Sequence, residues 1–238
     1  PETQRMIAAA DAIAPLVAMM RGTDAAQAGS GGGGGGDGEV AKSAAGAVAA
    51  LAEESQVNQV AIAEGDGIVP LVELLRSADS AAHENATRAL WYLATWPANQ
   101  LAIAHAGGVP PLIKMLSGES ERGQEWGAAA LEALSHGCPE NQVALSRAGA
   151  IQPLVMLLGS DGDEVQKYAQ GALLNIASAS EGNLREVVKA LVALLDVRNA
   201  GAQMKSAESL AILAAKSMVN RGAIAALELE TDAAKRLV

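Results

Sequence analysis

The sequence of 238 residues has no phenylalanine, and its aromatic residues are three tryptophans and two tyrosines. Only 18% of the residues are charged, whereas half are hydrophobic, which is too apolar for a disordered chain. Without large rings, the core must be built from alanine, leucine, valine and isoleucine. Alanine and leucine are strong helix formers. The composition therefore predicts an all-α protein.

A single cysteine, Cys138, permits no internal disulfide and favours a reducing compartment, so we expect a cytoplasmic protein, with the nucleus as the alternative. The net charge of −10 is opposite in sign to that of most nucleic-acid-binding proteins. No apolar run approaches the roughly 20 residues of a membrane helix. We therefore expect neither nucleic-acid binding nor membrane insertion. Because the chain begins at Pro1 in mid-pattern, we expect a fragment, and lipid anchoring through a preceding segment stays open.

Residues suited to catalysis are few. The three histidines lie far apart without an accompanying Asp or Cys pattern: His83, His105 and His136. Four carboxylates that are close in sequence fit a solvated helix start better than a metal site: Glu119, Glu121, Glu125 and Glu132. We expect no enzyme, no cofactor and no metal.

An internal repeat dominates the sequence. The pattern A-L-x-x-L-A recurs at spacings of 42, 41, 42 and 37 residues, in segments 47–52, 89–94, 130–135, 172–177 and 209–214. Two further blocks recur in step: one contains proline (Pro15, Pro70, Pro111 and Pro153), and the other contains Asn-Gln (Asn58, Asn99 and Asn141).

Each unit is predicted to form three helices. A short first helix carries the Asn-Gln block and ends near a glycine, Gly65, Gly107 or Gly149, where the chain turns sharply. A second helix starts at Pro70, Pro111 or Pro153, because proline suits the first helical turn. A long third helix ends at the A-L-x-x-L-A block.

The combined pattern resembles the armadillo repeat family. The likeness is carried most fully by the fourth unit, through Asn141, Ala148-Gly149-Ala150-Ile151, Pro153-Leu154-Val155, Leu157-Leu158, Val165-Gln166 and Ala172-Leu173-Leu174-Asn175-Ile176-Ala177. The resemblance implies a right-handed α-solenoid of about five repeats plus a partial C-terminal repeat. The predicted units are 1–52, 55–94, 97–135, 139–177 and 181–214, with a partial cap at 219–238.

Two units depart from the common length. The first has about 13 extra residues, which we assign to a mobile glycine-rich loop at 22–38. The fifth is about five residues short, and its first helix is expected to be compressed around Asn183 to Val188.

Comparison of the units in register separates core from surface. The register of Trp126 and Tyr168 also holds Ser43, Asn85 and Lys205, so we expect it to face solvent. The resemblance implies that third helices line a concave groove, with Asn175 at the position of the family's groove asparagine. The candidate groove residues are Asn85, Arg88, Tyr92, Trp96, Trp126, His136, Tyr168 and Asn175. Gly171 stands where nuclear-import adaptors of the family have tryptophan, which argues against that branch.

The resulting hypothesis is a non-enzymatic scaffold or adaptor that binds an extended segment of another protein, basic or rich in aromatic residues, in the groove. Two alternatives stay open. One is a structural solenoid in a larger assembly, such as a ciliary or organelle-tethering one, and the other is the regulatory module of a larger enzyme, such as a ubiquitin ligase. The oligomeric state is not specified by the sequence.

Overall fold

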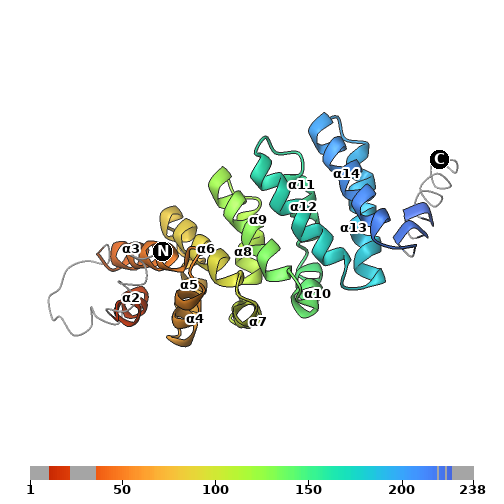
Figure 1. Ribbon diagram of the computed structural model, residues 1–238. Coiled ribbons are helices and arrows are strands. Elements are labelled where there is room, and N and C mark those ends of the chain that lie inside the picture. Colours follow the sequence, from red (N-terminus) through yellow and green to blue (C-terminus); the bar gives the residue numbers. More distant parts are fainter. Residues whose placement is uncertain (1–10, 22–35, 219, 223, 227–238) are drawn as a thin grey trace. The chain divides into compact units, whose positions relative to one another are not determined.

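The computed structural model describes residues 11–21, 36–218, 220–222 and 224–226 (Figure 1). Within these residues, all regular secondary structure is helical. The chain divides into two compact units, residues 1–134 and 135–238. None of the described helices is both long enough and apolar enough to cross a membrane.

The helices of the first unit are α2 (Ile13–Met20), α3 (Gly36–Ala52), α4 (Gln56–Glu64), α5 (Ile68–Leu74), α6 (Ser80–Ala94), α7 (Pro97–His105), α8 (Val109–Met115) and α9 (Glu121–Ser135). Those of the second unit are α10 (Pro139–Arg147), α11 (Ile151–Leu157), α12 (Asp163–Ala177), α13 (Glu181–Leu195) and α14 (Ala200–Lys216). The three-helix unit predicted from the sequence is found three times, as α4–α5–α6, α7–α8–α9 and α10–α11–α12.

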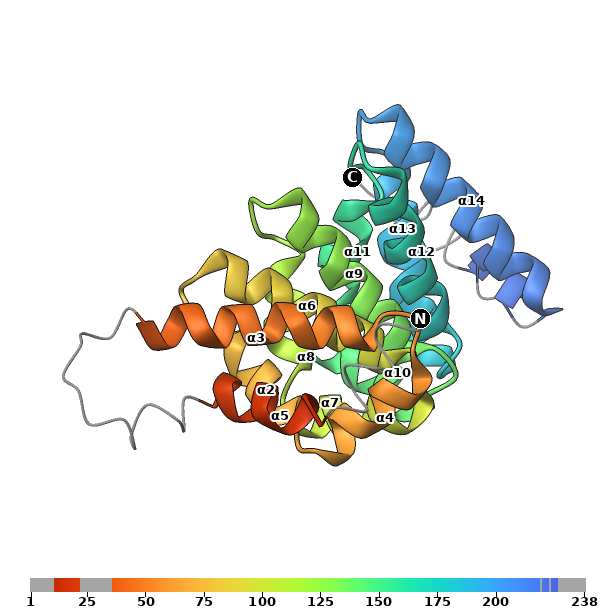
Figure 2. The same ribbon diagram turned by 60° about the vertical axis from the view of Figure 1, so that its left-hand side comes forward.

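Third helices of consecutive repeats pack against each other within a unit. In the first unit, α3 lies along α6 and also contacts α2, as Figure 2 shows. In the second unit, α12 contacts α10, α11, α13 and α14.

The corner between first and second helices requires a left-handed backbone. Gly107 and Gly149 have φ of +83° and +82°, and the equivalent residue in the preceding repeat is Asp66, with φ of +58°. Glycine adopts this conformation without steric cost, and aspartate is among the residues that tolerate it. Gly65, predicted at this corner, instead ends α4 with negative φ.

The second helices begin two residues before the prolines predicted to start them. Helix α5 starts at Ile68, and Pro70 is its third residue; Pro111 and Pro153 take the same place in α8 and α11. Proline is tolerated there because the N–H groups of the first helical turn have no partner within the helix.

The fifth repeat differs from the prediction. A compressed first helix was expected around Asn183 to Val188, but residues 181–195 form one continuous helix, α13. No glycine or proline follows Gly182 in this stretch, so nothing in the sequence turns the chain between a first and a second helix. The first two helices of this repeat are fused.

The loop predicted at 22–38 also needs correction, because Gly36 and Gly38 belong to helix α3. Residues 22–35 lie outside the described residues, as does most of the partial cap at 219–238. Asn220, which is described, donates to the carbonyl of Leu213 at 2.9 Å. Asn58, Asn99 and Asn183 make the equivalent contact at the start of earlier units.

The Asn-Gln block closes the end of the preceding third helix. Asn58, Asn99 and Asn183 each donate from Nδ2 to a carbonyl seven or six residues earlier, at distances of 2.8, 3.0 and 3.1 Å. Gln59 and Gln142 donate to the last carbonyls of α3 and α9, those of Ala52 and Ser135. The last carbonyls of a helix have no partner within it, so these buried amides stabilise each junction.

The second position of the A-L-x-x-L-A block is buried along most of the chain. Val48, Leu90, Leu131 and Leu173 are completely buried. Leu210, in the same register, is only half-buried, because among the described residues no further third helix follows α14.

Candidate functional site

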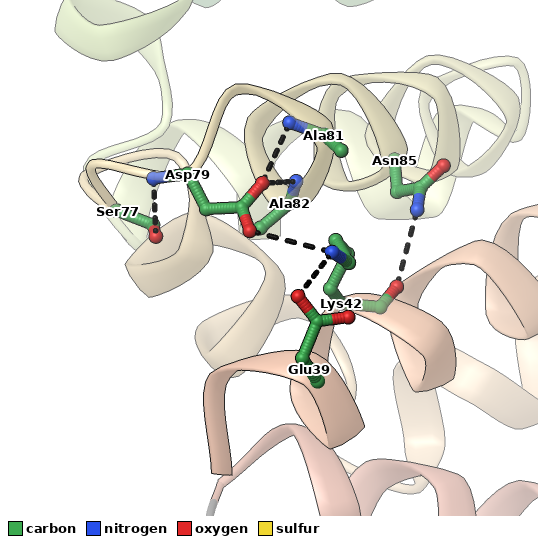
Figure 3. Close-up of polar contacts among 7 residues, drawn as sticks. All are labelled: Glu39, Lys42, Ser77, Asp79, Ala81, Ala82 and Asn85. Atoms are coloured by element: carbon green, nitrogen blue, oxygen red, sulfur yellow. Dashed lines mark hydrogen bonds and ion pairs between the residues drawn. The ribbon is translucent and has the colours of Figure 1, made fainter. Parts of the chain in front are cut away.

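The N-terminus of α6 is fixed on α3 by a polar network (Figure 3). The Asp79 carboxylate accepts from the N–H groups of Ala81 and Ala82, at 2.8 and 3.0 Å. The ammonium of Lys42 lies between Glu39 and Asp79, with N–O distances of 2.6 and 3.5 Å. The amide of Ala82, more than Lys42, holds the pKa of Asp79 below its ordinary value. Asp79 is therefore an ionised N-cap that orients α6.

Three candidate residues on α6 face α3. Asn85 donates to the carbonyl of Lys42 at 3.1 Å, and the missing side chain of Gly46 leaves room for its amide. Arg88 donates from Nη2 to the carbonyl of Gly46 at 3.4 Å. Tyr92, one turn further on, donates from its hydroxyl to Glu53 at 3.0 Å. All three side chains are half-buried, so one side of each is open to solvent.

Trp126 on α9 stands between two arginines. Its ring centroid is 5.6 Å from Cζ of Arg88 on α6 and 5.3 Å from Cζ of Arg122 on α9. Such cation–π contacts contribute from about 0.5 to 2 kcal/mol, depending on exposure. The tryptophan is half-buried, so it faces solvent only in part, whereas its register predicted an exposed position. We call Arg88, Trp126 and Arg122 the Trp126 cluster.

Tyr168 and Asn175 lie on α12 in the second unit, and both are half-buried. The Lys167 ammonium is 5.3 Å from the Tyr168 ring centroid and 2.9 Å from the carboxylate of Glu164. Asn175 donates from Nδ2 to Ser135 Oγ at 3.2 Å, so its amide joins α12 to the first residue of the same unit.

Trp96 and His136 do not lie on the third helices. Helix α6 ends at Ala94, and Trp96 is the half-buried residue that precedes α7. His136 is exposed just beyond the end of α9. Both were placed by extending the helical spacing beyond the last helical residue.

Arg122 was missed by the sequence reasoning, although a signal for it exists. It stands four residues before Trp126, and residues at this spacing share one face of a helix. Extending the comparison of repeats from Trp126 to the residue one helical turn earlier would have identified Arg122. The role of the Asn-Gln block as a junction was also not recognised.

Within the described residues, no group of three or more His, Cys, Asp or Glu side chains could hold a metal ion. His83 Nε2 hydrogen-bonds the carbonyl of Leu75, and burial holds its pKa below the ordinary value. His83 thus serves as a packed connection between α5 and α6.

Comparison with known proteins agrees with this repeat architecture. The pattern of the family described as armadillo/beta-catenin-like repeat matches residues 55–95 and 138–178. An engineered protein of the Northeast Structural Genomics Consortium is 33% identical, with a TM-score of 0.67 over 84% of this chain and 78% of that one. A designed armadillo repeat protein in complex with the peptide (KR)4 is 28% identical, with a TM-score of 0.71 over 88% of this chain and 84% of that one.

A natural protein shows the fold as well. The armadillo-repeats-only protein from Plasmodium falciparum has a TM-score of 0.60 over 71% of this chain and 78% of its own, and at 20% identity the likeness concerns the fold alone. No curated protein sequence matches the chain significantly.

Proposed function

The chain belongs to the armadillo/beta-catenin-like repeat family, and from this premise we propose that it is a non-enzymatic scaffold that binds an extended segment of a partner protein along its third helices. The all-α armadillo repeat fold predicted from the sequence is confirmed. Solenoids of this kind typically act through their surface rather than through catalysis. The single free thiol of Cys138 suits a reducing compartment, the cytoplasm.

The observation that carries this proposal is a row of half-exposed polar and aromatic side chains on consecutive third helices. Asn85, Arg88 and Tyr92 follow one face of α6, and Trp126 continues the row on α9. Tryptophan, tyrosine and arginine are the residue types that most often dominate binding energy at protein interfaces. The designed armadillo repeat protein in complex with (KR)4 is a protein of the same family that binds a peptide.

Hydrogen bonds between neighbouring third helices give this row a fixed geometry. Asn85 and Arg88 are bonded to backbone carbonyls of α3, and Tyr92 to Glu53 just beyond its end. Side chains that are already held in place lose little conformational entropy when a partner binds. The row therefore offers a partner a preorganised surface.

The test is selection of random linear peptides displayed on yeast against the whole chain. Peptides that bind are then titrated against Trp126→Ala and against a matched control, Val69→Ala, which truncates a residue 52% exposed on α5. Binding along the third helices predicts at least a tenfold loss for Trp126→Ala and no loss for Val69→Ala. Recovery of no binders, or of binders lost only with Val69→Ala, would contradict the proposal and favour a structural role through the outer helices.

A further inference from the structure

The Trp126 cluster has a charge that the described structure leaves uncompensated. Every ion pair found in the described residues involves other side chains, so neither Arg88 nor Arg122 has a carboxylate within 4 Å. Glu121 and Glu125 neighbour Arg122 on α9 but do not pair with it. In a chain with net charge −10, two guanidinium groups thus lie beside one ring, and neither has a carboxylate within 4 Å.

We propose that the Trp126 cluster is a subsite for a carboxylate side chain, Asp or Glu, of an extended partner segment. This inference rests on the proposed function and specifies the chemistry of the partner at one point. A guanidinium contacts an aromatic ring with its face, whereas its N–H donors lie along its edge. The contacts with Trp126 therefore place both guanidinium groups beside one ring, and their N–H groups are the donors available to an acceptor.

Those donors are almost unused. Arg88 makes one long hydrogen bond, to the carbonyl of Gly46 at 3.4 Å, and its buried Nε has no acceptor. Arg122 is exposed and makes no hydrogen bond within the described residues. A carboxylate can accept two parallel hydrogen bonds from a guanidinium, which makes such pairs strong and directional. The acidic side chain would also reduce the repulsion between the two cations.

A basic partner residue fits this position poorly. A lysine or arginine of a bound peptide usually binds an exposed tryptophan over the face of its ring. The ring of Trp126 already has two cations of this chain within 6 Å of its centroid. A third cation would meet repulsion from both. The basic segment considered from the sequence is therefore replaced, at this subsite, by an acidic one.

The test uses three peptides with blocked termini, (EL)4, (QL)4 and (KL)4, equal in length to (KR)4. Their affinities are measured by calorimetry with the whole chain at low and physiological salt. We expect (EL)4 to bind about tenfold more tightly than (QL)4, the effect of one charge-assisted hydrogen-bonded pair. We expect (KL)4 to bind most weakly.

Arg88→Gln and Arg122→Gln should each remove most of the preference for (EL)4 over (QL)4. Arg76→Gln is the matched control, because it makes the same change of net charge at an exposed residue between α5 and α6. Circular dichroism and melting temperature show whether each variant is folded, and Arg122→Gln, at an exposed position, keeps the test decisive if Arg88→Gln is unstable. In NMR spectra, the Nε–H signals of Arg88 and Arg122 should shift when (EL)4 is added.

The outcomes separate the two proposals. If (QL)4 binds, and Trp126→Ala weakens it, but (EL)4 gains nothing over it, the scaffold function stands and the carboxylate subsite is wrong. The same holds if the acidic preference survives both glutamine variants. If none of the three peptides binds, or if their binding is indifferent to Trp126→Ala, the carboxylate subsite is wrong. Both proposals fail if, in addition, the selection recovers no peptide whose binding depends on Trp126.

Discussion

Trp126 in the first unit and Tyr168 in the second occupy the same register of their repeats, yet the charges around the two rings are arranged differently. Two arginines lie over Trp126, and neither has a carboxylate partner. One lysine lies over Tyr168, and Glu164 neutralises it from 2.9 Å. The comparison teaches that an aromatic residue in this register does not define a binding site by itself. The charge left uncompensated beside the ring distinguishes the two.

The core positions of the third helices, in contrast, are buried to the same extent in both units. Leu90 on α6 and Leu173 on α12 share one register and are both completely inaccessible. The two units therefore have equivalent cores and unequal surfaces.

The largest expected effect tests the equivalence of the cores. Leu90→Ala and Leu173→Ala should each lower the free energy of unfolding by about 3 kcal/mol, because each leaves a cavity in a fully packed interior. Chemical denaturation followed by circular dichroism measures both. A difference of more than about 1 kcal/mol between them would show that the two units are not packed alike.

The next effect tests the inequality of the surfaces. Trp126→Ala should weaken the peptides selected on the wild-type chain by about 2 kcal/mol, or roughly 30-fold, whereas Tyr168→Ala should weaken them only a few-fold. Because Trp126 is half-buried, its truncation should cost the fold about 1 kcal/mol, less than that of a core leucine. Calorimetric titration and thermal unfolding of the same samples measure the two quantities. Equal losses of affinity for the two variants would remove the distinction between the rings.

The repeat, the ends of the third helices and the core registers could be predicted from the sequence because they depend on spacing alone. Proline and glycine fix the corners, and a leucine recurring at one register must be buried in every complete unit. The fused helix α13 could not be placed by counting, since the missing residues could have shortened either helix. Its lack of an internal glycine or proline was the available signal.

The site was predictable in part. The register comparison identified Trp126 and Arg88, but their contact joins α6 to α9 and depends on side-chain rotamers that spacing does not specify. Trp96 and His136 were assigned to third helices that end before them. Their case shows that helical spacing predicts a shared face only as far as the helix extends.

A smaller effect concerns the junctions between repeats. Asn99 in the first unit donates to two carbonyls, those of Leu93 and Gln59, whereas Asn183 in the second donates to that of Ile176. Asn99→Ala should therefore destabilise the fold by about 2 kcal/mol and Asn183→Ala by about 1 kcal/mol, since buried carbonyls lose their partners. Urea denaturation of the two variants, fitted with the same dependence of unfolding free energy on urea concentration, measures the difference in stability. A larger cost for Asn183→Ala would mean that the junction before the fused helix carries more of the stability.

The smallest effect comes from making the second unit resemble the first. Glu164→Gln removes the carboxylate that lies 2.9 Å from the Lys167 ammonium, the cation over Tyr168. The affinity for (EL)4 should then rise two- to threefold, because exposed charges interact by less than about 1 kcal/mol. The gain should disappear in about 1 M salt, where the screening length is about 3 Å.

The matched control for this variant is Glu181→Gln, which breaks the equivalent exposed pair with Arg185 on α13, where the two charges are 3.0 Å apart. Both variants change the net charge by the same amount, but only Glu164→Gln leaves a cation beside an aromatic ring. A rise in affinity confined to Glu164→Gln would show that an uncompensated cation over a ring is sufficient to attract an acidic segment. An equal rise for both variants would attribute the effect to net charge, and the contrast between Trp126 and Tyr168 would then not explain where a partner binds.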